Sequence, residues 1–318
     1  VKDRRRGNSY ELLYHLKEGI EAAGDEAVIV NENMSGPTVE GEMTPTAPMA
    51  AMFGYGGDKQ MHHTKGRRRE LANNCRAKNI PLITFDGGLL SSFGNVSTSP
   101  DHHFRVSLYT PMNDGNFLSE NSPSDRWEML VKKFNVKYEP WRKSDPSDPI
   151  IFVMQPKDNW SMNELDPIDW FKGVYEKLRP ITNRKFIVRP HPNNVSNILE
   201  REKELPSDVE IQYTKKHFVG DEKKYYRFHF QDVITNCHAV VTHNSTASVD
   251  SCVRGIPTFV TSDLALCWPV ANNDLSKIES PDYPDRSQWV NNLGYKLWSI
   301  KEIRDGTVYK RFKSKLGL

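Results

Sequence analysis

AVVTHNSTASVDSCVRGIPTFV, residues 239–260, carries the clearest structural pattern in the chain. Ala239–Thr242 is short, apolar and β-branched, which is typical of a strand buried in a parallel sheet. Thr246–Arg254 has helical periodicity, and Gly255 suits the position just after a helix. Ile256–Val260 has the composition of a second strand. The stretch therefore predicts strand, turn, helix and strand in succession, the repeating unit of an α/β fold.

Four polar residues fill the turn between the first strand and the helix: His243, Asn244, Ser245 and Thr246. In open α/β sheets, ligands bind at the carboxyl ends of the strands. Backbone N–H groups at the start of a helix also favour a phosphate. The alternative interpretation is a capped turn whose polar side chains are satisfied locally, since Ser and Thr are favoured helix caps. Four polar side chains in a row favour the ligand-binding interpretation.

The composition indicates a folded protein without membrane spans or disulfides. Its 318 residues are 37% hydrophobic and 26% charged, which predicts about two domains. No apolar run approaches the roughly 20 residues of a spanning helix, and the opening Val1–Arg6 is too polar for a signal peptide. The net charge of +2 neither demands nor excludes nucleic acid. The four cysteines lack CxxC spacing and predict reduced thiols in a cytoplasmic protein. They are Cys75, Cys237, Cys252 and Cys267.

Strand and helix patterns alternate along both halves of the chain. The expected helices are 9–23, 64–78, 125–134, 167–178, 195–205 and 230–237, with a mainly helical segment from Arg286 onward. The expected strands, besides the two in the opening stretch, are 28–30, 50–55, 80–85, 105–109, 150–154, 185–188 and 209–213. This alternation predicts parallel βαβ units. The proline-rich Pro140–Pro149 is the best linker. We therefore expect an α/β fold of two facing Rossmann-like domains, 1–143 and 144–318, and leave open that the final helices pack back on the first domain.

Asp86-Gly87-Gly88 follows the expected strand Ile80–Phe85 in the first half. A carboxylate at the carboxyl end of a strand can accept a proton from a substrate. Glycines allow a ligand to approach the backbone closely, and we assign Gly87 and Gly88 to ligand binding. The alternative interpretation is a simple turn, because Asp-Gly is a favoured turn pair.

Two basic clusters occur in the first half. One is the triplet Arg4, Arg5 and Arg6, and the other is Lys65, Arg67, Arg68 and Arg69 in the expected helix 64–78. Such runs are usually solvated helix faces. The alternative is contact with a polyanion such as DNA, whose phosphates lysine and arginine neutralise.

Arg189-Pro190-His191-Pro192 follows the expected strand 185–188. Arg189 and His191 can donate hydrogen bonds to a diphosphate leaving group, although His191 alone could be a turn histidine stiffened by two prolines. A cleft between two facing domains would bring this motif, the His243–Thr246 turn and Asp86 together. The combination fits transfer of a group from an activated phosphate ester to a hydroxyl, with Asp86 as the base.

At these residues the chain resembles the two-domain, GT-B-fold glycosyltransferases, and most closely the bacterial capsule and sialyl-type enzymes with acidic-Gly, His-Pro and Ser-Ser/Thr motifs. The resemblance implies a metal-independent transferase whose carboxylate is the general base and whose other two motifs hold the nucleotide phosphates of the donor. These roles fall on Asp86, His191, Ser245 and Thr246. Phe85 stands where that family has a first acidic residue.

The whole chain also resembles glycosyltransferases of tailed bacteriophages that modify hydroxymethylcytosine in DNA with glucose or arabinose. The likeness rests on the Arg-x-Gly-Asn-Ser start, the FRVSLY block and the HNSTAS segment. It implies a UDP-sugar donor, a DNA acceptor held by the basic clusters and, for a phage protein, a location in the host cytoplasm. CMP is the donor in several families that share the motifs. The alternatives are a surface-glycan acceptor, or a nucleotide-sugar epimerase of the same architecture.

Overall fold

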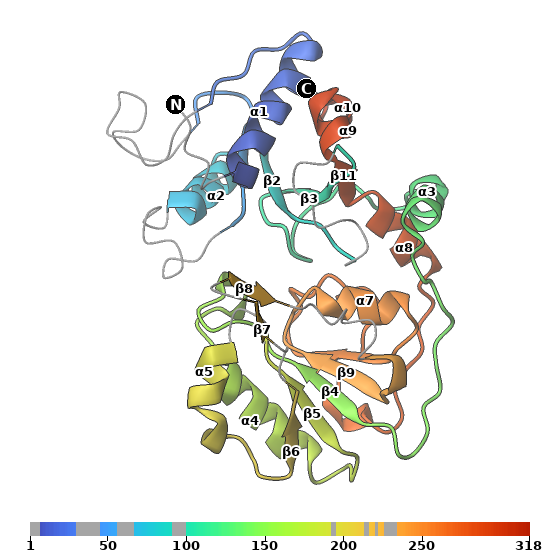
Figure 1. Cartoon of the computed structure of the whole chain (residues 1–318). Coiled ribbons are helices and arrows are strands. Elements are labelled where there is room, and N and C mark those ends of the chain that lie inside the picture. Colours follow the sequence, from blue (N-terminus) through green and yellow to red (C-terminus); the bar gives the residue numbers. More distant parts are fainter. Residues whose placement is uncertain are drawn as a thin grey trace. The chain divides into compact units, whose positions relative to one another are not determined.

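The computed structural model describes residues 7–29, 45–55, 67–90, 100–191, 195–212, 216–219, 222–225 and 234–318. For residues 7–10, 67, 196, 216–219 and 222–225 it describes the backbone only. The chain divides into two compact units (Figure 1). Unit 1 combines Val1–Asn135 with Val290–Leu318, and unit 2 is the continuous segment Val136–Trp289. Each unit is built on its own sheet.

The sheet of unit 2 has the strand order β10-β9-β4-β5-β6, and every pair is parallel. Figure 1 shows β9, β4, β5 and β6 side by side. The strands are β4 (Ile150–Val153), β5 (Phe186–Arg189), β6 (Val209–Ile211), β9 (Ala239–Thr242) and β10 (Thr258–Val260). This arrangement confirms the parallel sheet that the sequence predicts for the second half.

The central strands of this sheet are buried on both faces, which explains why they are continuous apolar runs. Ile150 and Phe152 pack in one core with the apolar side of α4 (Pro167–Leu178), while Ile151 packs in a second core on the other face. Helix α4 begins where the carboxylate of Asp166 accepts from the backbone N–H of Ile168. The opening stretch adds α7 (Ala247–Val253), which contacts β9 and β10.

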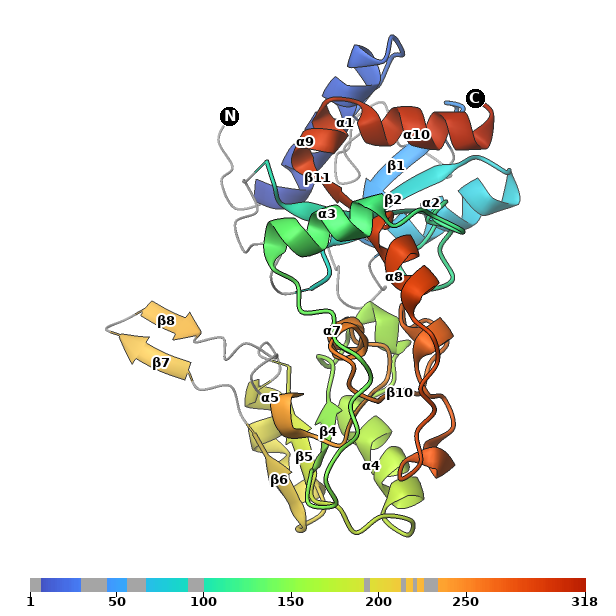
Figure 2. The same cartoon turned by 90° about the vertical axis from the view of Figure 1, so that its right-hand side faces the viewer.

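The remaining elements of unit 2 are short. They are η1 (Trp160–Met162), α5 (Val195–Glu200), η3 (Glu202–Glu204), η4 (Ile234–Asn236), η5 (Trp268–Val270) and η6 (Leu275–Lys277). The helix expected over 195–205 is therefore interrupted at Arg201. Strands β7 (Lys216–Val219) and β8 (Glu222–Tyr225) form an antiparallel hairpin (Figure 2). Within the described residues they pair only with each other.

Unit 1 has a mixed sheet with the order β1-β2-β3-β11. Its strands are β1 (Ala50–Phe53), β2 (Leu82–Gly87), β3 (His103–Leu108) and β11 (Leu297–Ser299). Only β1 and β2 run parallel, whereas β3 is antiparallel to both β2 and β11. The expectation of parallel βαβ units is therefore wrong for these strands. The chain passes from β2 to β3 without a helical crossover in the described residues, so β3 can return in the opposite direction.

Helices cover both faces of the unit 1 sheet. On one face, α1 (Gly7–Ala22), α9 (Ile300–Arg304) and α10 (Thr307–Leu316) share a core with Phe85, Val106 and Trp298. On the other face, α2 (Arg67–Ala77) packs Ala72 and Cys75 against Met52 and Leu82. Helix α3 (Asp125–Phe134) contributes buried Trp127 and Leu130. Helix α8 (Ser287–Gly294) leads from unit 2 back into unit 1.

The sequence-based expectations for residues 28–30 and for the C-terminal segment have different outcomes. The strand expected over 28–30 is not formed at residues 28 and 29, and Val28 is 84% exposed, so a short β-branched run without a partner strand gains nothing from pairing. Residue 30 lies outside the described ranges. The segment from Arg286 onward is mainly helical as expected, through α8, α9 and α10, and its one short strand β11 joins the sheet beside β3.

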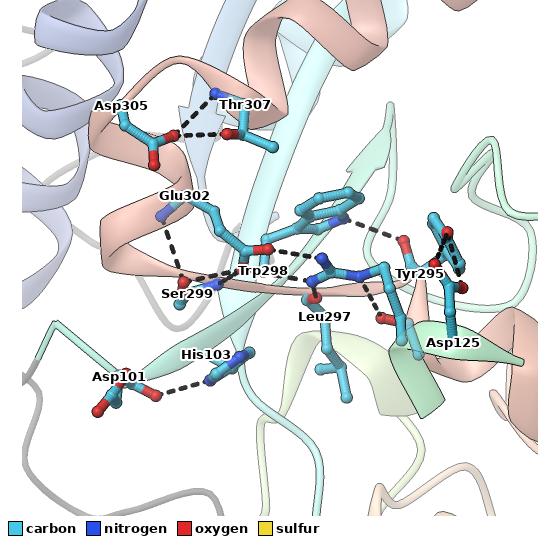
Figure 3. A network of polar contacts seen from close by, with 12 residues as sticks. Asp101, His103, Asp125, Tyr295, Leu297, Trp298, Ser299, Glu302, Asp305 and Thr307 are labelled. Carbon is cyan, nitrogen blue, oxygen red and sulfur yellow. Dashed lines mark hydrogen bonds and ion pairs between the residues drawn. The ribbon is translucent and has the colours of Figure 1, made fainter. Parts of the chain in front are cut away.

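Arg126 of α3 binds the C-terminal segment of unit 1 to the part formed by residues before 136. Its guanidinium forms an ion pair with Glu302 at 2.5 Å, donates to the carbonyl of Leu297 at 2.8 Å, and stacks 3.9 Å from the ring centroid of Trp298. Figure 3 shows Glu302 facing Ser299, with which it forms a capping box at the start of α9. Burial alone would raise the pKa of Glu302, but the hydrogen bonds and charge of Arg126 hold it below its ordinary value of 4.5.

We expect Glu302→Gln to destabilise the protein by about 1–3 kcal/mol at pH 7, because it removes a charge-assisted bond at a mostly buried site. Because the folded-state pKa of Glu302 is depressed, its contribution is present above pH 4.5 and is lost as the pH falls through the folded-state pKa. Denaturant unfolding of both proteins between pH 3 and 8 should therefore show the difference shrinking in acid. Glu128→Gln on the exposed side of α3 is the control, and a difference that stays constant with pH would contradict the assignment.

Candidate functional site

The strand order of unit 2 reverses at one point in its sheet. The chain moves from β4 outward to β5 and β6, and then returns to β9 on the other side of β4. In open parallel sheets, ligands bind outside the carboxyl ends of the strands where the order reverses in this way. The reversal lies between β4 and β9. The residues that follow these two strands therefore form the first candidate site.

The strand register aligns the predicted motifs along this edge. Thr242 pairs with Val260 and with Val153, and Val153 pairs with Arg189. These four residues form one row across β10, β9, β4 and β5. His243 follows the row on β9, and His191 follows it on β5. The two second-half motifs that the sequence singles out therefore lie at the same edge of one sheet.

Asn244 is committed to the protein interior. Its side-chain oxygen accepts from Gln155 at 2.8 Å, its amide donates to the carbonyl of Ser161 at 2.7 Å, and its backbone N–H donates to Gln155 at 3.1 Å. These bonds use the side-chain oxygen and one hydrogen of the amide, and a contact of Asn244 with the donor stays a prediction. Asn244 ties the segment after β9 to the segment after β4, and this fixes the turn that presents His243 and Ser245.

His243 is positioned by two residues that the sequence motifs do not include. Its Nδ1 lies 2.9 Å from Oγ1 of Thr261, which also accepts from Nε1 of Trp170 at 2.8 Å. With the Trp170 bond occupying one lone pair, the hydroxyl proton of Thr261 can go to Nδ1, which leaves Nε2 as the N–H donor. Burial lowers the pKa of His243 below 6.5, so the neutral form dominates near pH 7.

Ser245 and Thr246 stand at the start of α7. The hydroxyl oxygen of Ser245 accepts from the backbone N–H of Ala247 at 3.3 Å, which leaves its proton for another acceptor. Thr246 is the exposed N-cap residue, and its side chain makes no capping hydrogen bond. A local hydrogen bond at the start of α7 thus occupies the hydroxyl oxygen of Ser245 once, whereas the hydroxyl of Thr246 makes no capping bond.

Arg189 and His191 end β5 at the same edge. Arg189 is half-buried, its Nη1 lies 3.5 Å from Oε1 of Gln212, and burial lowers the pKa of its guanidinium. Among the described residues this long hydrogen bond is its one polar contact, which leaves most of its five N–H donors for a ligand. His191 is half-buried as well. The edge thus carries one cation and several neutral donors, which suits an anionic group.

Asp86 belongs to unit 1, and the structure changes its local context. Strand β2 extends to Gly87, so Asp86 pairs within the sheet, opposite Arg105, and is not a turn residue. Its carboxylate forms an ion pair with Arg105 at 2.9 Å and accepts from the backbone N–H of Gly87 at 2.7 Å. The Asp86 side chain is 24% exposed. Part of the carboxylate therefore faces solvent and can accept a proton.

The two glycines after Asp86 differ in their surroundings. A Cβ on Gly88 would overlap the backbone carbonyl oxygen of His103, so packing against β3 explains that glycine without a ligand. A Cβ on Gly87 would meet nothing within 4 Å. Packing against β3 is therefore enough to explain the glycine at 88. At Gly87 the expected ligand-binding role stays a prediction.

The basic clusters are only partly described. Arg4, Arg5, Arg6 and Lys65 lie outside the described residues, and Arg67 has a described backbone only. Arg68 and Arg69 are half-buried on α2, and Nη1 of Arg68 would lie 3.2 Å from a Cβ placed on Gly54. Arg68 therefore packs close to the end of β1 and is not fully extended into solvent.

Three further observations concern metal sites, cysteines and membrane-spanning helices. Within the described ranges, no group of three or more His, Cys, Asp or Glu side chains is placed to hold a metal ion. All four cysteines are free and buried. None of the described helices combines the length and apolar character that crossing a membrane requires.

Sequence reasoning missed Gln155, Thr261 and Arg105. Gln155 comes two residues after β4, and Thr261 comes directly after β10. The rule that drew attention to His243, a polar residue at the carboxyl end of a strand, also applies to both. Arg105 offered no comparable signal, because its role depends on the antiparallel pairing of β2 with β3.

Known structures share this fold. No protein-family model and no curated protein matches the sequence. KpsC of Thermosulfurimonas dismutans, described as a β-Kdo 2,4 transferase, matches at a TM-score of 0.55 and 14% identity, over 90% of this chain and 88% of that chain. A second structure, KpsC β-Kdo 2,7 transferase of the same organism, matches at a TM-score of 0.42 and 12% identity, over 77% and 90%. The first likeness confirms the two-sheet α/β fold.

Proposed function

We propose that this protein is a glycosyltransferase that binds a nucleotide sugar at the carboxyl edge of the unit 2 sheet. The observation that carries the proposal is the alignment of Arg189, His191 and His243 at the edge where the strand order reverses, with Ser245 beside them. These side chains supply one guanidinium and several neutral donors, a set that suits the phosphate of a leaving nucleotide.

The proposed donor is a CMP-linked acidic sugar of the Kdo type. Two considerations support it: the likeness to a chain described as a β-Kdo transferase, and the motifs that this sequence shares with CMP-sugar-using families. CMP therefore replaces UDP, the donor expected from the phage resemblance, as the first choice. His243 would donate through Nε2 to a phosphate oxygen, since Thr261 accounts for Nδ1.

The proposed acceptor is a hydroxyl of a surface glycan. The likeness to a chain described as a β-Kdo transferase, together with the motifs that resemble those of capsule-type enzymes, supports this acceptor over hydroxymethylcytosine in DNA. Among the described residues, the expected DNA-binding cluster contributes only the half-buried side chains of Arg68 and Arg69. We keep Asp86 as the proposed general base that accepts the proton of the attacking hydroxyl, because its carboxylate is partly exposed and held in place by Arg105.

We expect His191→Ala and Ser245→Ala each to weaken CMP binding by about 1–3 kcal/mol without unfolding the protein, since each removes one donor to the phosphate. Isothermal titration with CMP, and with UMP and UDP for comparison, measures the effect. His15→Ala and Ser280→Ala, both away from the sheet edge, are matched controls.

Three outcomes would contradict this proposal. Unchanged CMP affinity in both site variants would show that the phosphate does not bind at this edge of the sheet. Tighter binding of UDP than of CMP would restore the donor expected from the phage resemblance. Binding to duplex DNA that weakens steeply with salt would likewise point to the DNA acceptor, because phosphate contacts release counterions.

A further inference from the structure

Lys296 places a positive charge in unit 1 that has no acidic partner among the described residues. It lies in the turn before β11, where its backbone carbonyl accepts from the N–H of Val106 at 3.0 Å. Its Nζ lies 4.2 Å from the ring centroid of the buried Phe117. Within the described part of the chain, no hydrogen bond or ion pair involves this amine. Burial, with the nearby charge of Arg105, lowers the pKa of Lys296 to about 8.

The charges around Lys296 do not balance. Arg105 is almost fully buried and donates to the carbonyls of Gly87 and Pro111, each at 2.8 Å, as well as to Asp86 at 2.9 Å. Two cations, Lys296 and Arg105, therefore share one carboxylate. The sum over these three side chains is one positive charge.

Lys296 is half-buried, and an ammonium group that is partly withdrawn from water without an anion beside it is unfavourable. The face of an aromatic ring offsets only part of that cost. A purely apolar packing role would be served as well by methionine, which has a similar length and no charge. The amine therefore gains most from an anion, and the described residues provide none beside it. An excess of one charge matches a carboxylate, whereas a phosphate monoester carries about −1.5 to −2 at pH 7.

We propose that Lys296, supported by the charge of Arg105, binds the carboxylate of an acidic sugar in unit 1. This inference deepens the proposed function, since it gives the acidic sugar a residue that recognises it. Lys296 is a binding residue in this proposal and takes no part in bond breaking.

The first test measures how fast acetic anhydride acetylates Lys296 at pH 8, resolved by mass spectrometry of the full-length protein. Free Kdo at ten times its Kd should slow the modification about tenfold, because the free fraction falls to about one in eleven. The neutral methyl ester of Kdo and inorganic phosphate should give little protection. The exposed Lys301 on α9 is the internal control and should react equally in every sample.

The second test uses variants. Lys296→Met should fold with an unchanged melting temperature and bind Kdo no better than its methyl ester, while Lys296→Arg should keep the preference for the acid. Absence of protection by Kdo, equal protection by the ester or by phosphate, or a preference that survives in Lys296→Met would each overturn the proposal. Neither test requires a nucleotide or turnover, so a failure of the proposed donor site would leave these results interpretable.

Discussion

Asp86→Asn should lower turnover by about 10²–10⁴-fold, the usual contribution of a positioned general base, and leave nucleotide affinity near normal. Asparagine keeps the size of the side chain and an oxygen that can accept from Arg105, but it cannot accept the proton of an attacking hydroxyl. Nucleotide affinity should persist because the proposed phosphate contacts all come from unit 2. Steady-state kinetics with a CMP-sugar, together with titration by CMP, separates the two effects.

The ion pair with Arg105 makes a stability control necessary for this variant. Arg105 is almost fully buried, so weakening its partner lowers stability as well as activity. The melting temperature therefore has to be measured beside turnover, and the assay run well below it. Asp208→Asn is the matched control, because Asp208 is an exposed carboxylate that pairs with Arg179.

If Asp86→Asn retained more than about a tenth of normal turnover, the loss would be far smaller than removal of a general base causes. The base would then have to be sought elsewhere in the first half, at Asp58, which lies outside the described residues, or at Asp101. In that outcome the carboxylate of Asp86 would serve only to hold Arg105 between β2 and β3.

Gly255→Ala should be strongly destabilising, by about 2–5 kcal/mol. Gly255 has a φ of +69°, and a Cβ there would overlap the carbonyl oxygen of Pro140. The same backbone approach lets the N–H of Arg142 donate to the carbonyl of Gly255 at 2.7 Å. Alanine would therefore both strain the turn after α7 and push the 139–142 segment away from it. Thermal unfolding should show a drop of about 5–15 °C.

Gly173→Ala is the opposite case in the same unit. Gly173 lies inside α4, and a Cβ there meets nothing within 4 Å. Alanine should stabilise the helix by about 1 kcal/mol, since glycine is the poorer helix former. If both substitutions shifted the melting temperature by the same amount and sign, the close approach at Gly255 would be wrong.

The sequence predicts local elements best where one segment contains the whole signal. Helix α3 has the expected bounds 125–134, and α4 has the expected bounds 167–178. Both combine a helical apolar pattern with clear end signals, such as Asp166 before Pro167 in α4. The parallel sheet of unit 2 follows from the alternation of such segments.

Long-range pairing accounts for most of what the sequence could not predict. Strand β11 has three residues, too few for a period-two pattern, and it forms only because β3 offers an edge. Pairing with the same strand β3 also places Asp86 within a strand, whereas the sequence placed it just after one. At the candidate site, the contacts of Asn244 could not be predicted, because its partners Gln155 and Ser161 lie more than eighty positions away in sequence.

Unit 1 is built from two segments that are far apart in the sequence, and this affects how the chain folds while it is being synthesised. Residues 290–318 leave the ribosome only after all of unit 2, a delay of about 10–30 s at usual rates of synthesis. Until β11 arrives, β3 is an open edge of the kind that recruits other chains and starts aggregation. His103 and Arg105 on that strand are polar residues of the sort that discourages such pairing. The side chains that are buried in the finished protein would thus serve as gatekeepers while it is being made.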